Sequence, residues 1–478
     1  MSPTMALPPI IQGGMGVAIS GWALARAVAV HGQMGVVSGT GLDTVFVRRL
    51  QDGDVGGHLR RAMEHFPIPQ AVDEALGFFR PDGRDEGEPY ALLPMYGHLV
   101  DSARHRLTAL ANFVEVRLAK QGASGPVGIN LLTKIQTPTL ASLYGAILAG
   151  VDFVLMGAGI PREIPGALDR LARHESSSLS LDMPGSENEQ LIFDPRDLSG
   201  GRSIDESDRP RFLPIVASNS LAMVLARKAN GRVDGFVIEG PTAGGHNAPP
   251  RGPKTLNDRG EPVYGDRDLV DLERIADLGL PFWVAGGAGH PGRIEEVRAH
   301  GGEGIQVGTL FAFCQESGLA ETHRRAVLDQ AGSGAVEVLT EDRASPTGFP
   351  FKAVQLHGTL SDEGVYRGRD RICDLGYLRT PYRKPEGGIG FRCPAEPEDT
   401  FLKKGGAAEE LPGRKCLCNA LMATTGLAQV REGPSGNEPA YLTGGDDLRV
   451  LGSFLAGRTS YTAADVIQYL LPENESAV

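Results

Sequence analysis

The fold is decided by the stretch "FWVAGGAGHPGRIEEV", residues 282–297. In it an apolar run meets a helical pattern, and Gly287, Gly289 and Gly292 form the pattern G-x-G-x-x-G. A dinucleotide-binding fold also needs an acidic residue about 20 positions on, at the end of the following strand. The following apolar run, 304–308, ends without a carboxylate. The pattern therefore predicts a phosphate site at the start of a helix, but not a dinucleotide fold.

Short apolar runs alternate with helical patterns over the first 330 residues. Such alternation predicts parallel strands joined by helical crossovers. Eight runs are found, at 9–12, 34–38, 127–132, 152–156, 212–218, 235–239, 282–286 and 304–308.

Eight strand–helix units predict an α/β fold, a (β/α)8 TIM barrel. In that fold ligands bind over the C-terminal strand ends, and a phosphate often lies at the loops after strands seven and eight. These loops contain Gly286-Gly287-Ala288 and Gly308-Thr309. We therefore expect a mononucleotide phosphate there.

Two helical or polar insertions, at about 51–125 and 174–211, interrupt the predicted barrel domain, residues 1–340. The first includes a helical pattern over 102–121, and the second is expected to form an exposed flap. Residues 341–478 form a predicted C-terminal extension, packed on the barrel, with four cysteines and three helical patterns.

The composition excludes several classes of protein. A formal charge of −12 argues against a basic surface for nucleic acid or anionic lipid. Because no apolar run approaches a membrane span and no secretion signal is visible, we expect a cytoplasmic protein without membrane contact. Cys373, Cys393, Cys416 and Cys418 are then either ordinary thiols or ligands of a metal such as zinc.

The stretch "EGPTAGGHN", 239–247, holds the candidate proton-transfer group. His246 follows Gly244 and Gly245 just beyond a strand end, so its loop approaches a flat ligand closely. An imidazole exchanges protons near neutral pH. Glu239, at the strand end, is either a solvated carboxylate or a ligand contact.

Other strand ends carry small or polar residues suited to a neutral heteroaromatic ring. We expect these to contact the cofactor: Gly13, Gly14, Met15, Asn130, Ser218 and Gln306.

These stretches resemble those of the nitronate monooxygenase family, whose members are FMN-dependent barrel enzymes. The resemblance rests on "PPIIQGGMGVAISGW" from residue 8, "GPVGINLL" from 125, the AGGH element, "AGG…QVGT" within 282–317 and "GFPFKAV" from 348. The family often has Glu immediately before AGGH, where this chain has Thr242.

The resemblance implies that FMN is bound, with its phosphate on the backbone of 286–288 and 308–309. It also implies that His246 removes a substrate α-proton and that an alkyl nitronate is oxidised to a carbonyl compound and nitrite. The protein orients the reactants and handles protons, and FMN carries the electrons.

The stretch "RPRFLPIVASNS", 209–220, and the cysteine-bearing tail resemble instead the FMN-dependent enoyl reductases of polyketide and polyunsaturated fatty acid synthases. That likeness implies NAD(P)H as the reductant, an enoyl thioester on an acyl carrier protein as the substrate, and His246 as the proton donor. A third alternative is a flavin-carrying accessory protein of a synthase. Oligomerisation is possible in each case.

Overall fold

The computed structural model describes residues 7–186, 189–201, 204–432 and 436–471. Parts of the predicted flap (187–188 and 202–203) and of the extension (433–435 and 472–478) lie outside the described residues. No helix within the described ranges is both long and apolar enough to cross a membrane.

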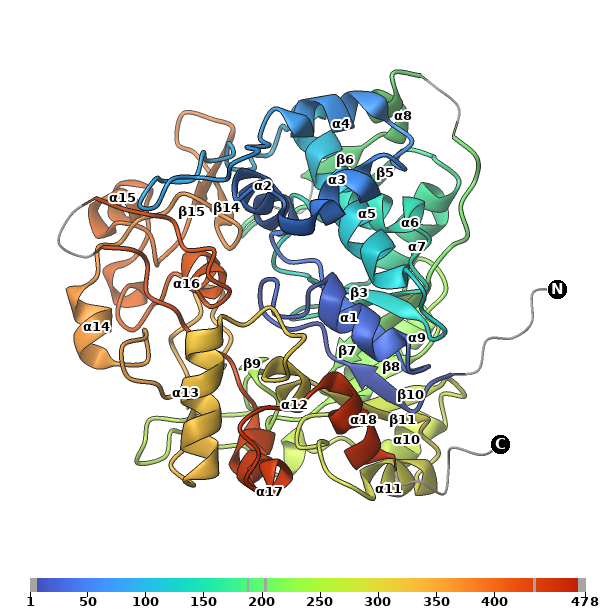
Figure 1. Cartoon of the computed structure of the whole chain (residues 1–478), viewed down its shortest axis with the longest axis vertical. Coiled ribbons are helices and arrows are strands. Elements are labelled where there is room, and N and C mark those ends of the chain that lie inside the picture. Colours follow the sequence, from blue (N-terminus) through green and yellow to red (C-terminus); the bar gives the residue numbers. More distant parts are fainter. Residues whose placement is uncertain (1–6, 187–188, 202–203, 433–435, 472–478) are drawn as a thin grey trace.

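A nearly closed barrel of eight parallel strands forms the centre of the molecule (Figure 1). All eight expected strands are present, so the predicted TIM barrel is confirmed. A parallel bridge between Ile11 and Met34 joins the first and last strands of the sheet order. In barrel order the strands are β1 (Ile10–Gln12), β11 (Gly304–Val307), β10 (Phe282–Ala285), β8 (Phe236–Glu239), β7 (Arg211–Val216), β4 (Phe153–Gly157), β3 (Val127–Leu132) and β2 (Gly35–Ser38).

Alternate side chains of these strands fill the barrel, as the two-residue period of a strand requires. The indole of Trp283 lies fully buried among them and donates a hydrogen bond to the carbonyl of Pro8 at 2.9 Å. The other cluster members are Ile11, Met34, Val36, Phe153, Leu155, Leu213, Val237 and Ala285. This packed interior makes the strand ends a rigid platform for a site.

Helices cover the outside of the barrel. They are α1 (Trp22–Ala29), α5 (Ser102–Lys120), α6 (Thr139–Leu148), α7 (Ile164–Ala172), α9 (Asn219–Lys228), α10 (Leu272–Ala276), α11 (Arg293–Ala299) and α12 (Thr309–Ala312). Helix α5 packs against α1 and α6, so it serves as the crossover between β2 and β3.

The two insertions have structure of their own. Between β2 and α5 lie α2 (Leu42–Gln51), a short 3-10 turn (Val55–Gly57), α3 (His58–Met63) and α4 (Pro69–Leu76). The described part of the expected flap contains a hairpin of β5 (Ser177–Ser180) and β6 (Gln190–Phe193), followed by α8 (Pro195–Ser199).

The chain after α12 wraps the barrel with small elements. It begins with α13 (Glu321–Gly332), β12 (Val338–Glu341) and β13 (Phe351–Val354), and β13 also pairs with β9 (Gly245–His246). There follow α14 (Glu363–Gly368), the hairpin of β14 (Thr380–Arg383) and β15 (Ile389–Arg392), α15 (Glu398–Lys403), a 3-10 turn (Ala408–Glu410) and α16 (Leu417–Ala423). Figure 1 shows α14 to α16, in orange, together on one side of the molecule.

The last elements return to the barrel. A 3-10 turn (Asp446–Val450) leads into α17 (Leu451–Leu455), and α18 (Ala463–Leu470) packs against α1 and α12. The spacing of Thr462 and Asp465 predicts a capping box, which is confirmed: the Thr462 hydroxyl accepts from the Asp465 N–H, and the Asp465 carboxylate accepts from the Thr462 N–H.

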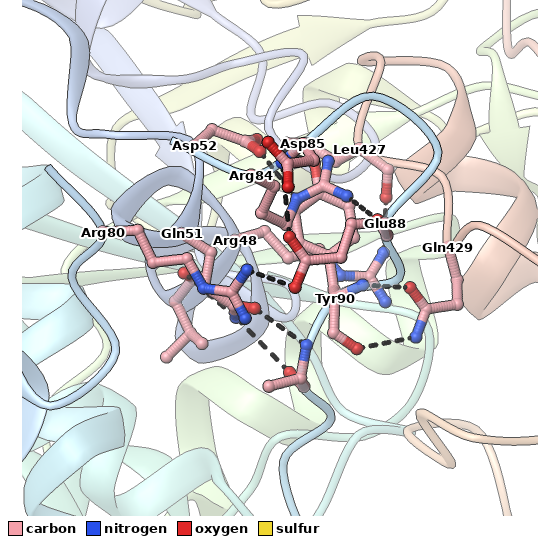
Figure 2. A network of polar contacts seen from close by, with 12 residues as sticks. Arg48, Gln51, Asp52, Arg80, Arg84, Asp85, Glu88, Tyr90, Leu427 and Gln429 are labelled. Carbon is pink, nitrogen blue, oxygen red and sulfur yellow. Dashed lines mark hydrogen bonds and ion pairs between the residues drawn. The ribbon is translucent and has the colours of Figure 1, made fainter. Parts of the chain in front are cut away.

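A polar network fastens the first insertion to the extension (Figure 2). The fully buried Arg48 of α2 donates to the carbonyl of Leu427 and lies 4.8 Å from the ring of Tyr90. Gln429 accepts from the Tyr90 N–H at 2.8 Å and donates to the Tyr90 carbonyl at 2.9 Å. Asp52 accepts from the Tyr90 hydroxyl at 2.7 Å. The chain just after α16 is therefore held at a fixed distance from α2.

Candidate active site

A cavity of about 440 Å³ opens over the C-terminal ends of the barrel strands. Loops from all eight strands and several segments of the extension contribute to its wall. Of the fifteen residues predicted for the organic site, fourteen line it: Gly13, Gly14, Met15, Asn130, Ser218, Glu239, Gly244, Gly245, His246, Gly286, Gly287, Gln306, Gly308 and Thr309. Ala288 is fully buried and does not line the cavity.

His246 lies in the cavity wall on β9, opposite Phe351 of β13. Its Nε2 is hydrogen-bonded to the hydroxyl of Ser345 at 2.7 Å, and its ring meets that of Phe351 edge-on with centroids 4.9 Å apart. The Nδ1 atom has no hydrogen-bond partner among the described residues. Burial lowers the pKa of His246 to about 4, so the imidazole is neutral at pH 7 and is a weaker base than a solvated histidine.

Ser345 is a positioning residue that the sequence did not reveal. It is fully buried, and its hydroxyl oxygen also accepts from the N–H of Thr347 at 3.2 Å. These contacts fix the rotation of the imidazole. Its only sequence signal was its closeness to "GFPFKAV", since a serine in a loop is otherwise common.

Two amide side chains present unused acceptors in the wall. Asn130 donates through Nδ2 to the Gly14 carbonyl at 2.8 Å, which leaves its buried Oδ1 without a partner. The Oε1 atom of Gln306 is likewise buried without a partner. Unpaired buried acceptors are costly, and a ring that carries N–H groups would satisfy them.

Glycines allow the loops to approach a ligand. A Cβ on Gly14 would lie 2.4 Å from the Cβ of Asn130, so no larger residue fits there. Gly286 and Gly287 have φ values of +85° and +62°, which glycine adopts at little cost. This backbone is suited to bind an anionic group.

Ser218 has a second role. Its hydroxyl accepts from the Leu221 N–H at 3.0 Å and so caps α9. Helix capping alone accounts for a serine at this position, although the side chain also borders the cavity.

Glu239 ends β8 and lines the cavity half-buried. Its carboxyl forms no hydrogen bond within the described part of the chain, and burial raises its pKa to about 7. Thr242, which stands where the resembling family often has Glu, also lines the cavity and lies beside Gly286 and Gly287. Glu239 is thus the acidic group that this loop brings to the site.

The segment 443–447 of the extension, Thr-Gly-Gly-Asp-Asp, threads between the loops predicted to hold the phosphate. The Gly445 N–H donates to the Thr309 hydroxyl at 2.9 Å, and Asp447 accepts from the Gly289 N–H at 3.1 Å. Burial raises the pKa of Asp447. The sequence analysis missed this segment, for which the pair Gly444-Gly445 before two acids was the only signal.

The four cysteines of the extension lie in one region. Cys393 and Cys416 are buried in one small cluster, against which Cys418 packs. Like charges of the neighbouring thiols add to burial in raising the pKa of Cys418. However, no three His, Cys, Asp or Glu side chains in the described ranges are arranged to hold a metal ion. The arrangement therefore does not support the predicted zinc site at Cys373, Cys393, Cys416 and Cys418.

Residues 203–344, from the approach to β7 to just beyond β12, match the family model described as nitronate monooxygenase. No curated protein matches the sequence.

Solved structures with a similar arrangement have low sequence identity. One is a nitroalkane oxidase from Streptomyces ansochromogenes, at 15% identity and a TM-score of 0.47, covering 97% of this chain and 94% of that chain. Another is the enoyl reductase domain of MlnA from the macrolactin biosynthesis cluster of Bacillus amyloliquefaciens, at 11% identity and 0.45, covering 97% and 95%. FabK from Thermotoga maritima has 16% identity and a TM-score of 0.38, covering 84% and 92%.

The matched region contains β7, β8, β10 and β11 with their loops, and therefore His246 and both predicted phosphate loops. Over these residues the match confirms the resemblance to the nitronate monooxygenase family that the motifs indicate.

Proposed function

We propose that this chain is an FMN-dependent oxidoreductase that oxidises an alkyl nitronate, formed in the site when His246 removes the α-proton of the neutral nitroalkane, to a carbonyl compound and nitrite. The observation that carries the proposal is His246, a neutral imidazole with a free Nδ1 in the wall of a cavity over the barrel strands. The family match to residues 203–344 supports the same chemistry.

The cavity fits the cofactor. Gly286, Gly287 and Gly308 offer close backbone approach for the phosphate, and the unpaired Asn130 and Gln306 oxygens suit N–H groups of the ring. Bound FMN would supply the two-electron chemistry that no side chain provides. Gly13, Gly14, Met15 and the loop 244–245 complete the proposed contacts.

The chain itself handles the proton. His246 is neutral above about pH 4, so Nδ1 accepts the α-proton of a neutral nitroalkane and a nitronate remains. Ser345 binds the opposite nitrogen, which leaves Nδ1 as the ring nitrogen without a partner among the described residues. Molecular oxygen is the terminal oxidant of the proposed reaction.

The second candidate is an enoyl-thioester reductase that uses NAD(P)H, with an acyl carrier protein as partner. It is favoured by apolar side chains of the extension in the cavity wall, among them Leu378, Leu417 and Leu421, which suit an acyl chain. In this reaction hydride reaches the β-carbon, and the imidazole, once protonated, gives its proton to the α-carbon.

Three assays on the purified protein test these candidates. A flavin spectrum with oxygen uptake and nitrite release on adding propyl nitronate supports the first. Bleaching by NADH or NADPH followed by reoxidation with an enoyl thioester supports the second. Bound FMN with neither activity would refute both and favour a flavin-carrying accessory protein, and a chain that binds no FMN would refute all three.

A further inference from the structure

One end of the cavity is apolar and is built largely by the extension. Five side chains form what we call the apolar lobe: Leu132 at the end of β3, Ile135 in the loop after it, Leu378 before β14, and Leu417 and Leu421 of α16. All five belong to one hydrophobic cluster or pack against it.

The lobe is continuous with the proton-transfer group. Phe351 belongs to the same cluster as Ile135, Leu378 and Leu417, and its ring meets that of His246 at 4.9 Å. The nearby Tyr377 turns its hydroxyl away, toward the hydroxyl of Thr44 at 2.6 Å and the carboxylate of Asp43. None of the five lobe side chains is charged, so the lobe offers contact and no polar partner.

The lobe is held in place by packing with neighbouring segments. Met422 of α16 packs with Val17, Val45 and Leu427 in a second cluster, against which Leu421 also packs. The network of Figure 2 fixes the chain that follows α16 through Leu427 and Gln429. A preformed pocket binds its ligand without the cost of ordering its own side chains.

We propose that the apolar lobe binds an unbranched alkyl or acyl chain of several carbons, attached to the carbon whose proton His246 exchanges. The assignment rests on the proposed function for the reacting end of the substrate. It makes the substrate a chain-bearing nitronate or thioester rather than a small nitroalkane. The extension, and not the barrel, then sets the preference for chain length.

The test uses FMN-loaded protein and linear nitronates from ethyl to hexyl. Each methylene buried in the lobe should raise kcat/KM about fourfold. Leu421→Phe, which fills the lobe from α16, should remove most of this increase, so that the ratio of kcat/KM for the hexyl and ethyl substrates falls toward one. Leu132→Phe tests the opposite wall if the first variant does not fold.

Leu402→Phe is the matched control, since Leu402 lies 42% exposed on α15 and away from the cavity. It should keep the wild-type dependence on chain length. Flavin fluorescence titration should give the same FMN affinity for all folded variants. A kcat/KM independent of chain length in the wild type, or an equal loss on short and long substrates in both lobe variants, would overturn the proposal.

Failure of the proposed function would be recognised separately. If no nitronate is oxidised at any length, perturbation of the bound flavin spectrum by linear carboxylates of two to eight carbons still reports binding in the lobe. Affinity that rises with length in the wild type and in Leu402→Phe, but not in Leu421→Phe, would support the lobe. Affinity independent of length would refute it.

Discussion

Replacing Glu239 with Gln should stabilise the FMN-free protein at alkaline pH and have little effect at acidic pH. Burial raises the pKa of this carboxyl from 4.5 to about 7, and the group has no hydrogen-bond partner among the described residues to lose. That increase in pKa means that ionising the carboxyl in the folded state costs at most about 3 kcal/mol more than in the unfolded state. Because the side chain borders an open cavity, water reduces the penalty to about 2 kcal/mol.

The sign follows from proton linkage. The folded pKa is above the unfolded one, so the folded state binds more protons between pH 4.5 and 7, and wild-type stability falls as the pH rises through this window. Below about pH 4.5 the carboxyl is neutral in both states, and Gln gains nothing. Above about pH 7 the full penalty is present only in the wild type.

Urea unfolding followed by circular dichroism, at about pH 4.5 and about pH 8.5, measures the difference. Glu386→Gln, at the exposed tip between β14 and β15, serves as the matched control and should change neither value. An equal free-energy change for Glu239→Gln at both pH values, or a destabilisation at about pH 8.5, would refute the reasoning.

Three further substitutions test the site. His246→Ala should lower kcat/KM for a neutral nitroalkane by about 10²–10⁴ but spare a preformed nitronate, which needs no base. The wild type should lose nitroalkane activity as the pH falls toward 4, because the imidazole is then protonated. Equal losses on both substrates in His246→Ala would contradict a role in proton removal. Ser345→Ala should cost about fivefold on the nitroalkane alone, since it removes one hydrogen bond that orients the imidazole, and unchanged kinetics would exclude that role. Asp447→Ala should weaken FMN binding about tenfold in a fluorescence titration because the Gly289 N–H loses its acceptor. Asp447→Asn keeps an acceptor and should bind FMN nearly as tightly as the wild type. Identical FMN affinities for both variants would show that the contact is irrelevant to the cofactor.

The sequence predicts the barrel well because each strand is short, apolar and bounded by glycine or polar residues. It also brings His246 to the right end of the barrel, since the loop after a parallel strand lies at one rim whatever the remaining chain does. Only local patterns were needed for these conclusions.

The contacts between distant segments could not be predicted in this way. The hydrogen bonds from Gly445 to Thr309 and from Gly289 to Asp447 join residues far apart in the chain. Neither contact produces a periodic pattern in the sequence from which it could be predicted. For the four cysteines the sequence allowed two predictions, ordinary thiols or metal ligands. Cys393 and Cys416 are buried and Cys373 and Cys418 are half-buried, and the described ranges hold no group of side chains arranged for a metal, which favours ordinary thiols.

The packing of α18 against α1 has a consequence for how the molecule forms. These helices are among the first and last elements of the described chain, so the outer layer closes through a contact of very high sequence separation. Contacts of this kind slow folding because a long loop must close before they add stability. Because α1 also packs on β2 and α5, most of its contacts can form early, and only the part that α18 covers must wait for the last helix of the described chain.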